Sequence, residues 1–283
     1  MTGLQDRTLL NDGNKMPWVG LGVYLTQEGS QVENSVRWAL ETGYRLVDTA
    51  KIYGNEAGVG RAVRESGIAR EQVFITTKLW NADHGYKSTL LACEKSLKTL
   101  GLDYIDLYLI HWPGLNKKDR LATWEAMLEL KAKQKVLSVG VSNFKPYHID
   151  ELIAAHGVAP AVDQVELHPF QAQQELRQYA KDKGILVTAW GPIFHGHIHE
   201  APAVISEIGQ KYGKTAAQTV LRWHLQSGIS VIPKSVKQHR IAENADIFDF
   251  ALSDDDMAAI DGLNRGRGYG ADPDVMTYGF ENI

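Results

Sequence analysis

Residues 45–56 read RLVDTAKIYGNE and contain the pattern from which the architecture follows. The apolar start predicts a short buried strand over RLVDT, and a helical pattern begins at about Glu56. Asp48 lies near the end of this strand, and Tyr53 lies between the strand and the helix. A strand followed by a helix is the repeating unit of α/β folds, so the number of repeats along the chain determines the class.

The same unit recurs along most of the chain. Apolar runs at 73–78 (VFITTK) and 104–111 (YIDLYLIH) are followed by helical patterns from about Ser88 and Asp119. Five further runs are LSVGV, VDQVEL, ILVTAW, ISVIP and, before all of these, VGLGV near Val19. Strands of a parallel sheet are buried on both faces and therefore read as continuous apolar runs. Eight units without a flexible linker predict a (β/α)8 TIM barrel that forms a single domain over residues 1–283.

Three segments lie outside the eight units. Asp12-Gly13 is a hairpin turn signal, so an N-terminal β-hairpin is expected to cover the amino end of the barrel. Two extra helices are expected at 201–212 and 253–263, the second with Ser253 as its amino cap. The Gly-rich tail from Asn264 onward is predicted to be a loop.

A doubly wound dinucleotide-binding fold is the main alternative. Its fingerprint needs three glycines in register between the first strand and the first helix. Gly20 and Gly22 have no such third glycine, and the glycines at 266, 268 and 270 lie in the tail. We therefore reject this fold on the sequence.

The bulk composition narrows the class further. Of 283 residues, 44% are hydrophobic and 23% charged, as in ordinary globular proteins. The net charge of −4 argues against a nucleic-acid partner. Cys93 is the only cysteine, and its place on an apolar helix face favours a buried structural role. No signal peptide and no bilayer-spanning run is evident, so we expect a cytoplasmic protein without a membrane partner.

The polar residues at the strand ends suggest the chemistry. If the strands are neighbours in the barrel, Asp48, Tyr53, Lys78 and His111 converge at its carboxyl end, where such barrels build active sites. A nearby ammonium lowers the pKa of a tyrosine, which is ordinarily about 10. Each residue alone has an ordinary structural explanation, but the set of four predicts acid chemistry on a carbonyl or similar oxygen.

Five motifs occur in the order seen in one enzyme family. They are Asp48-Thr49-Ala50 with Tyr53 and Asn55-Glu56, then Thr77-Lys78, then LYLIHWP ending at Pro113, then GVSNF, then IPKS at Ile232 to Ser235. This order resembles the aldo-keto reductases, and the resemblance runs from about Leu9 to Asp274. It is strongest for bacterial and protozoan members that reduce small dicarbonyls, sugar-acid diketones or prostaglandin precursors.

The resemblance implies an NADP-dependent oxidoreductase that transfers hydride from NADPH to an aldehyde or ketone. Tyr53 then acts as general acid, Lys78 lowers its pKa, Asp48 pairs with Lys78, and neutral His111 orients the carbonyl oxygen. The family also implies a monomer, and it requires no metal.

The resemblance also implies a coenzyme site. It assigns the 2′-phosphate to Lys234, Ser235 and Arg240, and the adenine side to Glu243 and Asn244. Trp190 resembles the aromatic that stacks on the nicotinamide, next to Gly191. The remaining coenzyme residues are expected to be Ser142, Asn143 and Gln164 at the carboxamide, together with Gly22, Val23 and Val236.

The substrate pocket is expected to be walled by Tyr24, Trp80 and Trp112 and to include His111. Its shape is expected to depend on the loops after the fourth and seventh strands and on the tail after Asn264.

The chain departs from the family pattern at three positions. Lys51 adds a cation where a small residue is usual, Gly191 follows Trp190 where serine is commoner, and Asp163 replaces the usual asparagine. The sugar-acid reductases share the Trp-Gly pair. These departures affect substrate and coenzyme details rather than the class of reaction.

Three alternatives remain open on the sequence. Lys78 can instead form a Schiff base, as in aldolases, or the barrel can sense the nucleotide without turnover. Alternating histidines at 195, 197 and 199 invite a metal interpretation, but no carboxylate or cysteine with standard spacing accompanies them. We therefore expect these histidines to border the coenzyme loop.

Overall fold

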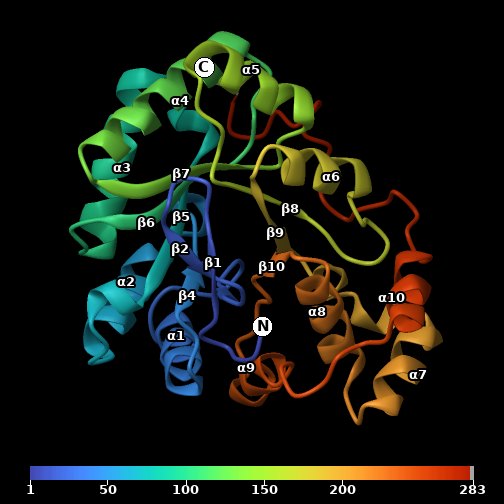
Figure 1. The fold of residues 1–283 in the computed structure, drawn as a ribbon. Helices are drawn as coiled ribbons and strands as arrows, with labels where there is room; N and C mark the ends of the chain where they lie inside the picture. The colour runs from blue at the N-terminus through green and yellow to red at the C-terminus, as the bar shows by residue number, and fades with distance from the viewer. Residues whose placement is uncertain (281–283) are drawn as a thin grey trace.

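Eight parallel strands form the centre of the protein in a computed structural model that describes residues 1–280. Their hydrogen-bonded order follows the sequence from β3 to β10, and helices lie around the outside (Figure 1). The strands are β3 (Leu21–Gly22), β4 (Leu46–Asp48), β5 (Phe74–Leu79), β6 (Ile105–Ile110), β7 (Val136–Ser142), β8 (Val162–Glu166), β9 (Leu186–Trp190) and β10 (Ser230–Val231).

The first and last strands close the sheet into a barrel. Parallel bridges join Val19 to Val231 and Gly22 to Lys234. The backbone N–H of Gly20 donates to the carbonyl of Val231 at 2.9 Å across the same seam. The predicted (β/α)8 fold is therefore confirmed, and the doubly wound alternative is excluded because an open sheet has no such seam.

Ten α-helices are present among the described residues, and they are α1 (Ser30–Thr42), α2 (Glu56–Glu65), α3 (Tyr86–Leu100), α4 (Lys117–Ala132), α5 (Pro146–His156), α6 (Gln174–Asp182), α7 (Ala203–Lys211), α8 (Ala216–Gln226), α9 (Gln238–Ala245) and α10 (Asp254–Asp261). The two extra helices, α7 and α10, are confirmed. Helix α4 begins two residues before the expected Asp119, because the Asn116 side chain accepts from the N–H groups of Lys118 and Asp119 and caps the first turn.

The predicted hairpin is present at the amino end of the barrel. Strands β1 (Arg7–Leu9) and β2 (Lys15–Pro17) are antiparallel, and Gly13 takes the positive φ of 90° that the turn requires. The side chain of Asn14 donates to the carbonyl of Leu137 at the start of β7. The hairpin therefore closes the end of the barrel opposite the strand carboxyl ends, and it is seen in front of the strands in Figure 1.

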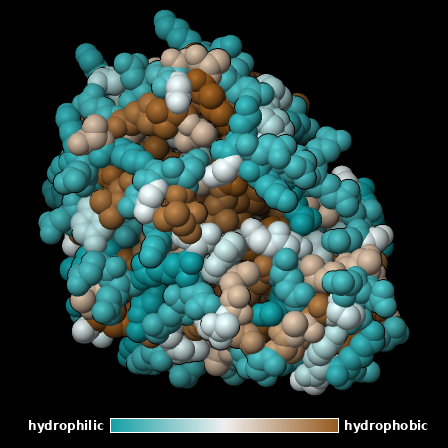
Figure 2. Space-filling model, viewed as in Figure 1, coloured by the Kyte–Doolittle hydropathy of each residue, from teal (hydrophilic) through white to brown (hydrophobic). Residues whose placement is uncertain are grey.

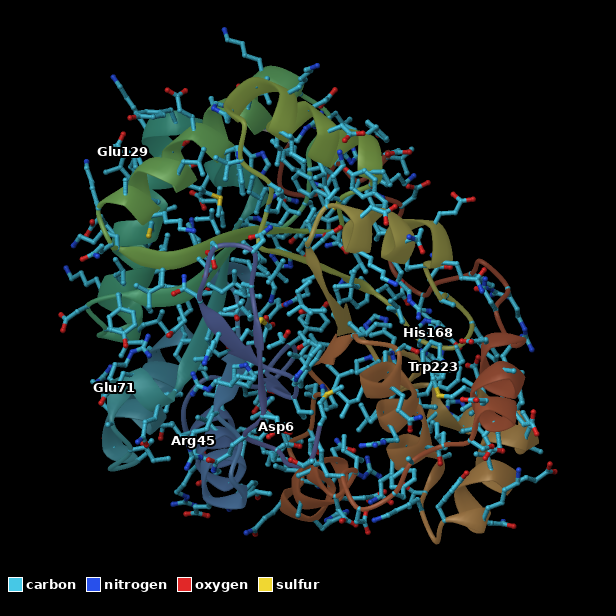
Figure 3. All side chains as sticks on the ribbon, in the orientation of Figure 1. Asp6, Arg45, Glu71, Glu129, His168 and Trp223 are labelled. Carbon is cyan, nitrogen blue, oxygen red and sulfur yellow. The ribbon has the colours of Figure 1, made fainter. Side chains whose placement is uncertain are left out.

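Two layers of apolar residues hold the fold together. The barrel interior is filled by a cluster that includes Leu46, Leu107 and Leu109 from the strands and Met16 from the hairpin. A larger layer lies between strands and helices, and it contains the fully buried Trp223 that Figure 3 labels. On the face in Figure 2, hydrophilic residues cover most of the periphery and hydrophobic residues gather in the upper part and the centre.

Three smaller expectations concern single residues and the tail. Cys93 is free and buried, and burial raises the pKa of its thiol to about 12, as expected of a structural residue. The tail from Asn264 to Phe280 contains turns but no helix or strand, as predicted. Within residues 1–280, no helix combines the length and the apolar character needed to cross a bilayer.

Candidate active site

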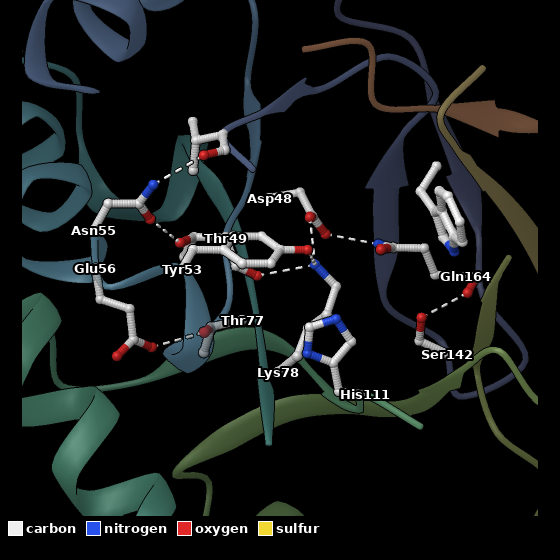
Figure 4. A network of polar contacts seen from close by, with 12 residues as sticks. Asp48, Thr49, Tyr53, Asn55, Glu56, Thr77, Lys78, His111, Ser142 and Gln164 are labelled. Atoms are coloured by element: carbon white, nitrogen blue, oxygen red, sulfur yellow. Dashed lines mark hydrogen bonds and ion pairs between the residues drawn. The ribbon is translucent and has the colours of Figure 1, made fainter. Parts of the chain in front are cut away.

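The four residues expected to share a cavity lie together at the carboxyl end of the barrel (Figure 4). Asp48 is the last residue of β4, Lys78 lies near the end of β5, and His111 directly follows β6. These three strands are adjacent and parallel, so their carboxyl ends form one continuous stretch of rim. Tyr53 ends a single 3₁₀ turn after β4, which returns its ring over the rim.

An ion pair between Lys78 and Asp48 lies at the base of this site. Nζ of Lys78 donates to Oδ1 of Asp48 at 2.5 Å and to the Thr49 carbonyl at 3.0 Å. The same ammonium donates to the hydroxyl of Tyr53 at 3.3 Å. Lys78 and Asp48 are both at least 98% buried. Because Asp48 and Tyr53 outweigh the effect of burial, the pKa of Lys78 is raised and its side chain stays cationic.

The second carboxylate oxygen of Asp48 extends the network across the barrel. Nε2 of Gln164 donates to Oδ2 of Asp48 at 2.7 Å. The Ser142 hydroxyl donates to the backbone carbonyl of Gln164 at the same distance. All three side chains are buried. The expected carboxamide residues Ser142 and Gln164 are therefore joined to the ion pair, a link that sequence order did not indicate.

The sequence-based expectation about the pKa of Tyr53 is wrong in sign for the protein alone. Burial raises the pKa of the phenol, and the opposing effect of Lys78 does not overcome it. Asp48 raises the pKa further by disfavouring a second negative charge. Tyr53 is therefore a neutral phenol at neutral pH. The charge of Lys78 keeps its pKa lower than burial alone would set it.

His111 faces the phenol from the next strand end. The ring centroids of Tyr53 and His111 are 5.8 Å apart with an edge-on geometry. Burial, together with the charge of Lys78, holds the pKa of His111 well below its ordinary value. The imidazole is therefore neutral, as expected.

Buried polar contacts fix the turn that carries Tyr53. The Asn55 side chain donates to the carbonyls of Val23 and Thr26 and accepts from the Thr49 hydroxyl. These bonds join the loop after β3 to the loop after β4 (Figure 4). Because Asn55 lies two residues after Tyr53, they restrict the position of the phenol.

The expected coenzyme residues Asn143 and Trp190 lie beside the catalytic group. The Asn143 side chain donates to the His111 carbonyl and accepts from Nε1 of Trp190, both at 2.9 Å. Gly191, which follows Trp190, adopts a positive φ of 59° and starts a loop that turns back at His195. The Trp190 indole is thus held by its polar edge, leaving its faces to pack on other rings.

The expected phosphate residues lie at the seam of the barrel. Lys234 follows β10 and Arg240 lies on α9, and both are exposed. Within residues 1–280 neither side chain has an ion-pair partner. The neighbouring expected residues occupy the same region: Gly22, Val23 and Ser235 are buried, Val236 is half-buried, Glu243 accepts from the Thr215 hydroxyl, and Asn244 is buried.

Aromatic rings wall the opening above the phenol. Tyr24 lies 5.0 Å from the Tyr53 ring, and Trp80 lies 5.3 Å from His111, each measured between centroids. Trp112 is half-buried and lies two residues after the end of β6. The sequence did not indicate Tyr278, whose ring packs edge-on against Trp80 at 5.7 Å.

The tail, which was expected to help shape the substrate pocket, crosses the barrel mouth. Oε1 and Oε2 of Glu166 accept the backbone N–H groups of Tyr269 and Gly270 at 2.7 and 2.8 Å. Glu166 is also bonded at 3.1 Å to His168, a buried residue labelled in Figure 3. The glycines of the tail were the sequence signal for this close approach. A side chain on Gly270 would lie only 2.6 Å from Trp190.

Two of the departures from the family pattern, Lys51 and Asp163, place charged groups at the site. Lys51 forms an ion pair with Asp83, so its charge is balanced at the rim rather than left free. Asp163 lies on β8 and is fully buried. Burial raises the pKa of its carboxyl well above the ordinary value, and only the backbone N–H of Phe144 opposes that effect.

Comparison with known proteins agrees with this geometry. Residues 19–265 match the model of the aldo/keto reductase family. The chain is 50% identical to glyoxal reductase of Bacillus subtilis, covering 98% of this chain and 99% of the relative. It is 49% identical to the 9,11-endoperoxide prostaglandin H2 reductase of Trypanosoma cruzi, with 96% of each chain covered.

Solved structures show the same relationship. An aldo-keto reductase from a Medee basin deep-sea metagenome library superposes with a TM-score of 0.93 at 42% identity, covering 96% of this chain and 100% of the other. A mutant of Gox0644 in complex with NADPH gives a TM-score of 0.90 at 43% identity, covering 97% and 99%.

The barrel, the buried ion pair beside a tyrosine, and these matches define an oxidoreductase that acts on carbonyl groups. The chain belongs to the aldo-keto reductase family.

Proposed function

We propose that this protein reduces aldehydes and ketones to alcohols with NADPH, and that Tyr53 is the general acid. The observation that carries the proposal is the placement of the Tyr53 hydroxyl 3.3 Å from the ammonium of Lys78, which is itself paired with Asp48. A half-buried phenol beside a buried cation can release a proton to a developing alkoxide, since the cation stabilises the phenolate that remains.

Each residue of the set has a separate task in this mechanism. The bound coenzyme supplies the hydride. Tyr53 donates its proton to the carbonyl oxygen as negative charge develops there, and Lys78 stabilises the resulting phenolate. Asp48 keeps Lys78 charged and in place through its 2.5 Å contact. Neutral His111 orients the carbonyl oxygen by a hydrogen bond, which an imidazolium in this buried position would not do without a large desolvation cost.

The protein's own groups fit NADPH. Two exposed cations without ion-pair partners in the described chain, Lys234 and Arg240, can bind a phosphate near Ser235, and the planar fork of Arg240 suits bidentate contact. Trp190 offers a ring face, and Asn143 holds its indole edge. The coenzyme contacts are assigned to Gly22, Val23, Ser142, Asn143, Gln164, Trp190, Gly191, Lys234, Ser235, Val236, Arg240, Glu243 and Asn244.

The substrate class follows from the rim and from the relatives. Tyr24, Trp80 and Trp112 form an aromatic wall, and Asp83 neutralises the cation of Lys51. This surface favours uncharged carbonyl compounds, such as small dicarbonyls, sugar-derived carbonyls and aromatic aldehydes. Identity to a glyoxal reductase supports the dicarbonyls.

The ion pair also bears on the Schiff-base alternative. A lysine must lose its proton before it can attack a carbonyl. The raised pKa of Lys78 opposes that loss, so the geometry favours the reductase. We further propose that residues 1–283 form one domain that acts as a monomer in the cytoplasm.

The direct test measures NADPH oxidation with glyoxal, methylglyoxal and an aromatic aldehyde. Tyr53→Phe keeps the ring and removes the proton donor, so turnover should fall by about 10²-fold or more while NADPH binding, followed by fluorescence, is retained. Tyr104→Phe is a matched control, since Tyr104 lies at the amino end of β6. Full turnover by Tyr53→Phe would refute the proposed acid, and a borohydride-trapped adduct on Lys78 would support the aldolase alternative.

The coenzyme preference is tested separately with NADPH and NADH. Arg240→Ala should weaken NADPH binding by about tenfold and leave NADH binding unchanged, because only NADPH carries the 2′-phosphate. Equal effects on both coenzymes would contradict the assignment of Arg240.

A further inference from the structure

Three side chains with metal-binding atoms meet on the surface after β9. Nδ1 of His197 lies 2.9 Å from Oε1 of Glu200, and Nε2 of His199 lies 3.9 Å from the same oxygen. One ligand atom from each residue can be chosen so that all lie within 4.8 Å of one another. The sequence offers no carboxylate at a standard ligand spacing from the histidines, but two short 3₁₀ turns bring Glu200 to both imidazoles.

The tail fixes the orientation of two of these groups. The Tyr269 ring stacks on the His197 ring with centroids 4.6 Å apart and planes 1° apart. The Tyr269 hydroxyl donates to Oε2 of Glu200 at 3.0 Å, which leaves Oε1 directed at the histidines. The backbone of Tyr269 is itself held by Glu166. Such outer contacts orient ligands and raise metal affinity in established sites.

We propose that His197, His199 and Glu200 form a binding site for a divalent transition-metal ion of the zinc type. Two imidazoles and one carboxylate, with water in the fourth position, are a ligand set that Zn²⁺ takes readily. The ion would replace the direct contact between Nδ1 of His197 and Oε1 of Glu200. The side chains are 45–74% exposed, so the ion can reach them from solvent and the distances can shorten by rotation of side chains.

The local charges suit a cation. The carboxylate of Glu200 faces both imidazoles through Oε1, while Oε2 accepts from the Tyr269 hydroxyl. His195, the third histidine of the run, turns away and packs against Trp190 at 5.4 Å instead. The site is thus built by one loop and steadied by Tyr269, and it lies outside the catalytic group around Lys78.

A bound ion would also restrain two segments together. Glu200 belongs to the loop after β9, and Tyr269 belongs to the tail, so the ion, Glu200 and Tyr269 form one connected unit. Zinc should therefore slow amide hydrogen exchange both in residues 195–200 and at residues 269–270. This effect is independent of the proposed reaction, because it needs neither coenzyme nor substrate.

The test is titration calorimetry of the full-length protein, freed of any polyhistidine tag, with zinc chloride. One ion should bind per chain, and His199→Ala and Glu200→Gln should each lower the affinity by about tenfold or more. His239→Ala is the matched control, because His239 is exposed on α9, away from the cluster, and its loss should change nothing. Tyr269→Phe keeps the stacked ring but loses the bond to Glu200, so a smaller loss of affinity is expected.

Two results would overturn the proposal. The first is the absence of a saturable zinc site in the wild-type protein. The second is zinc binding that persists unchanged in both His199→Ala and Glu200→Gln. Circular dichroism of each variant separates loss of the site from loss of the fold, and these exposed side chains leave the apolar core intact.

Discussion

The backbone N–H of Gly270 donates a 2.8 Å hydrogen bond to Oε2 of Glu166, and this contact holds the tail against the edge of Trp190. Glu166 and Trp190 are direct partners across β8 and β9. The position of a loop about a hundred residues further along the chain is therefore set by the same strand ends that carry the expected nicotinamide platform. Glu166 therefore links the tail to Trp190, the residue expected to stack on the nicotinamide.

Substitution Gly270→Ala should displace the tail. The added methyl group would lie 2.6 Å from Trp190 and 3.0 Å from Glu166, which is too close for either. We expect a loss of about 1–3 kcal/mol in unfolding free energy, measured by urea denaturation, and faster amide exchange at Tyr269. Gly262→Ala is the control, because its new methyl group would meet ordinary contacts of 3.4 Å. Equal stability of the two variants would show that the tail yields freely.

Substitution Lys78→Met should destabilise the protein as well as slow it. The change leaves the carboxylate of Asp48 buried without its cation, at a cost of about 3–5 kcal/mol in unfolding free energy. Addition of Asp48→Asn should recover part of that stability but none of the activity. A double variant no more stable than Lys78→Met would mean that the buried charge of Asp48 is not the cause.

The pH dependence of turnover should lack a step near the ordinary histidine pKa. His111 has a pKa well below 6.5, so it is neutral at every pH above that value. The pKa of Tyr53 is raised above 10, so its proton is present at neutral pH and is lost only in alkaline solution. We expect kcat/KM to be level from about pH 6 to 9 and to fall at higher pH. An inflection near pH 6.5 that disappears in His111→Asn would contradict the neutral imidazole.

Substitution Asp83→Asn should change the charge preference of the substrate site. The change frees the cation of Lys51 at the rim, so aldehydes that carry a carboxylate should gain several-fold in kcat/KM over uncharged ones. Asp103→Asn, at the amino end of the barrel, should leave the ratio unchanged. The measurement compares 4-carboxybenzaldehyde with benzaldehyde at low salt. No change in the ratio would place the substrate away from Lys51.

Substitution Asp163→Asn should raise stability at neutral and alkaline pH. The folded-state pKa of Asp163 is raised, so the folded chain keeps a proton that the unfolded chain loses above about pH 4. The contribution of Asp163 to the free energy of unfolding therefore falls as pH rises from the unfolded-state pKa to the folded-state pKa. An asparagine removes the pH dependence, and a gain of about 1 kcal/mol or more at pH 8 is expected from urea unfolding.

The matched control for Asp163 is Asp106→Asn, the same substitution at another buried strand position. Burial raises the pKa of Asp106 too, but this carboxyl pairs with Arg70 and accepts from the backbone N–H of Ile75, so its replacement leaves the Arg70 guanidinium without its ion-pair partner. Its loss should therefore destabilise the protein. Similar stability changes in both variants would show that the ion pair of Asp106 does not distinguish the two sites.

The sequence predicted the barrel because its information is local and repeated. Apolar runs such as the one ending at Lys78 indicate buried strands wherever they fold, and parallel strands place their carboxyl ends on one rim. Family motifs then supplied the roles of Tyr53 and His111. The closing seam, by contrast, rests on two-residue strands, and the bridges from Val19 to Val231 and from Gly22 to Lys234 complete it.

Three properties depended on the tertiary structure. The pKa of Tyr53 moves upward because burial outweighs the neighbouring ammonium, and burial is a property of the whole fold. Glu200 becomes a partner of His197 through two short turns, and Tyr269 joins them from the tail. The sequence alone therefore determines the residue types and the order of the strands. Which groups lose water, and which distant groups meet, is decided only when the chain packs, because desolvation and contact are set by neighbours far apart in sequence.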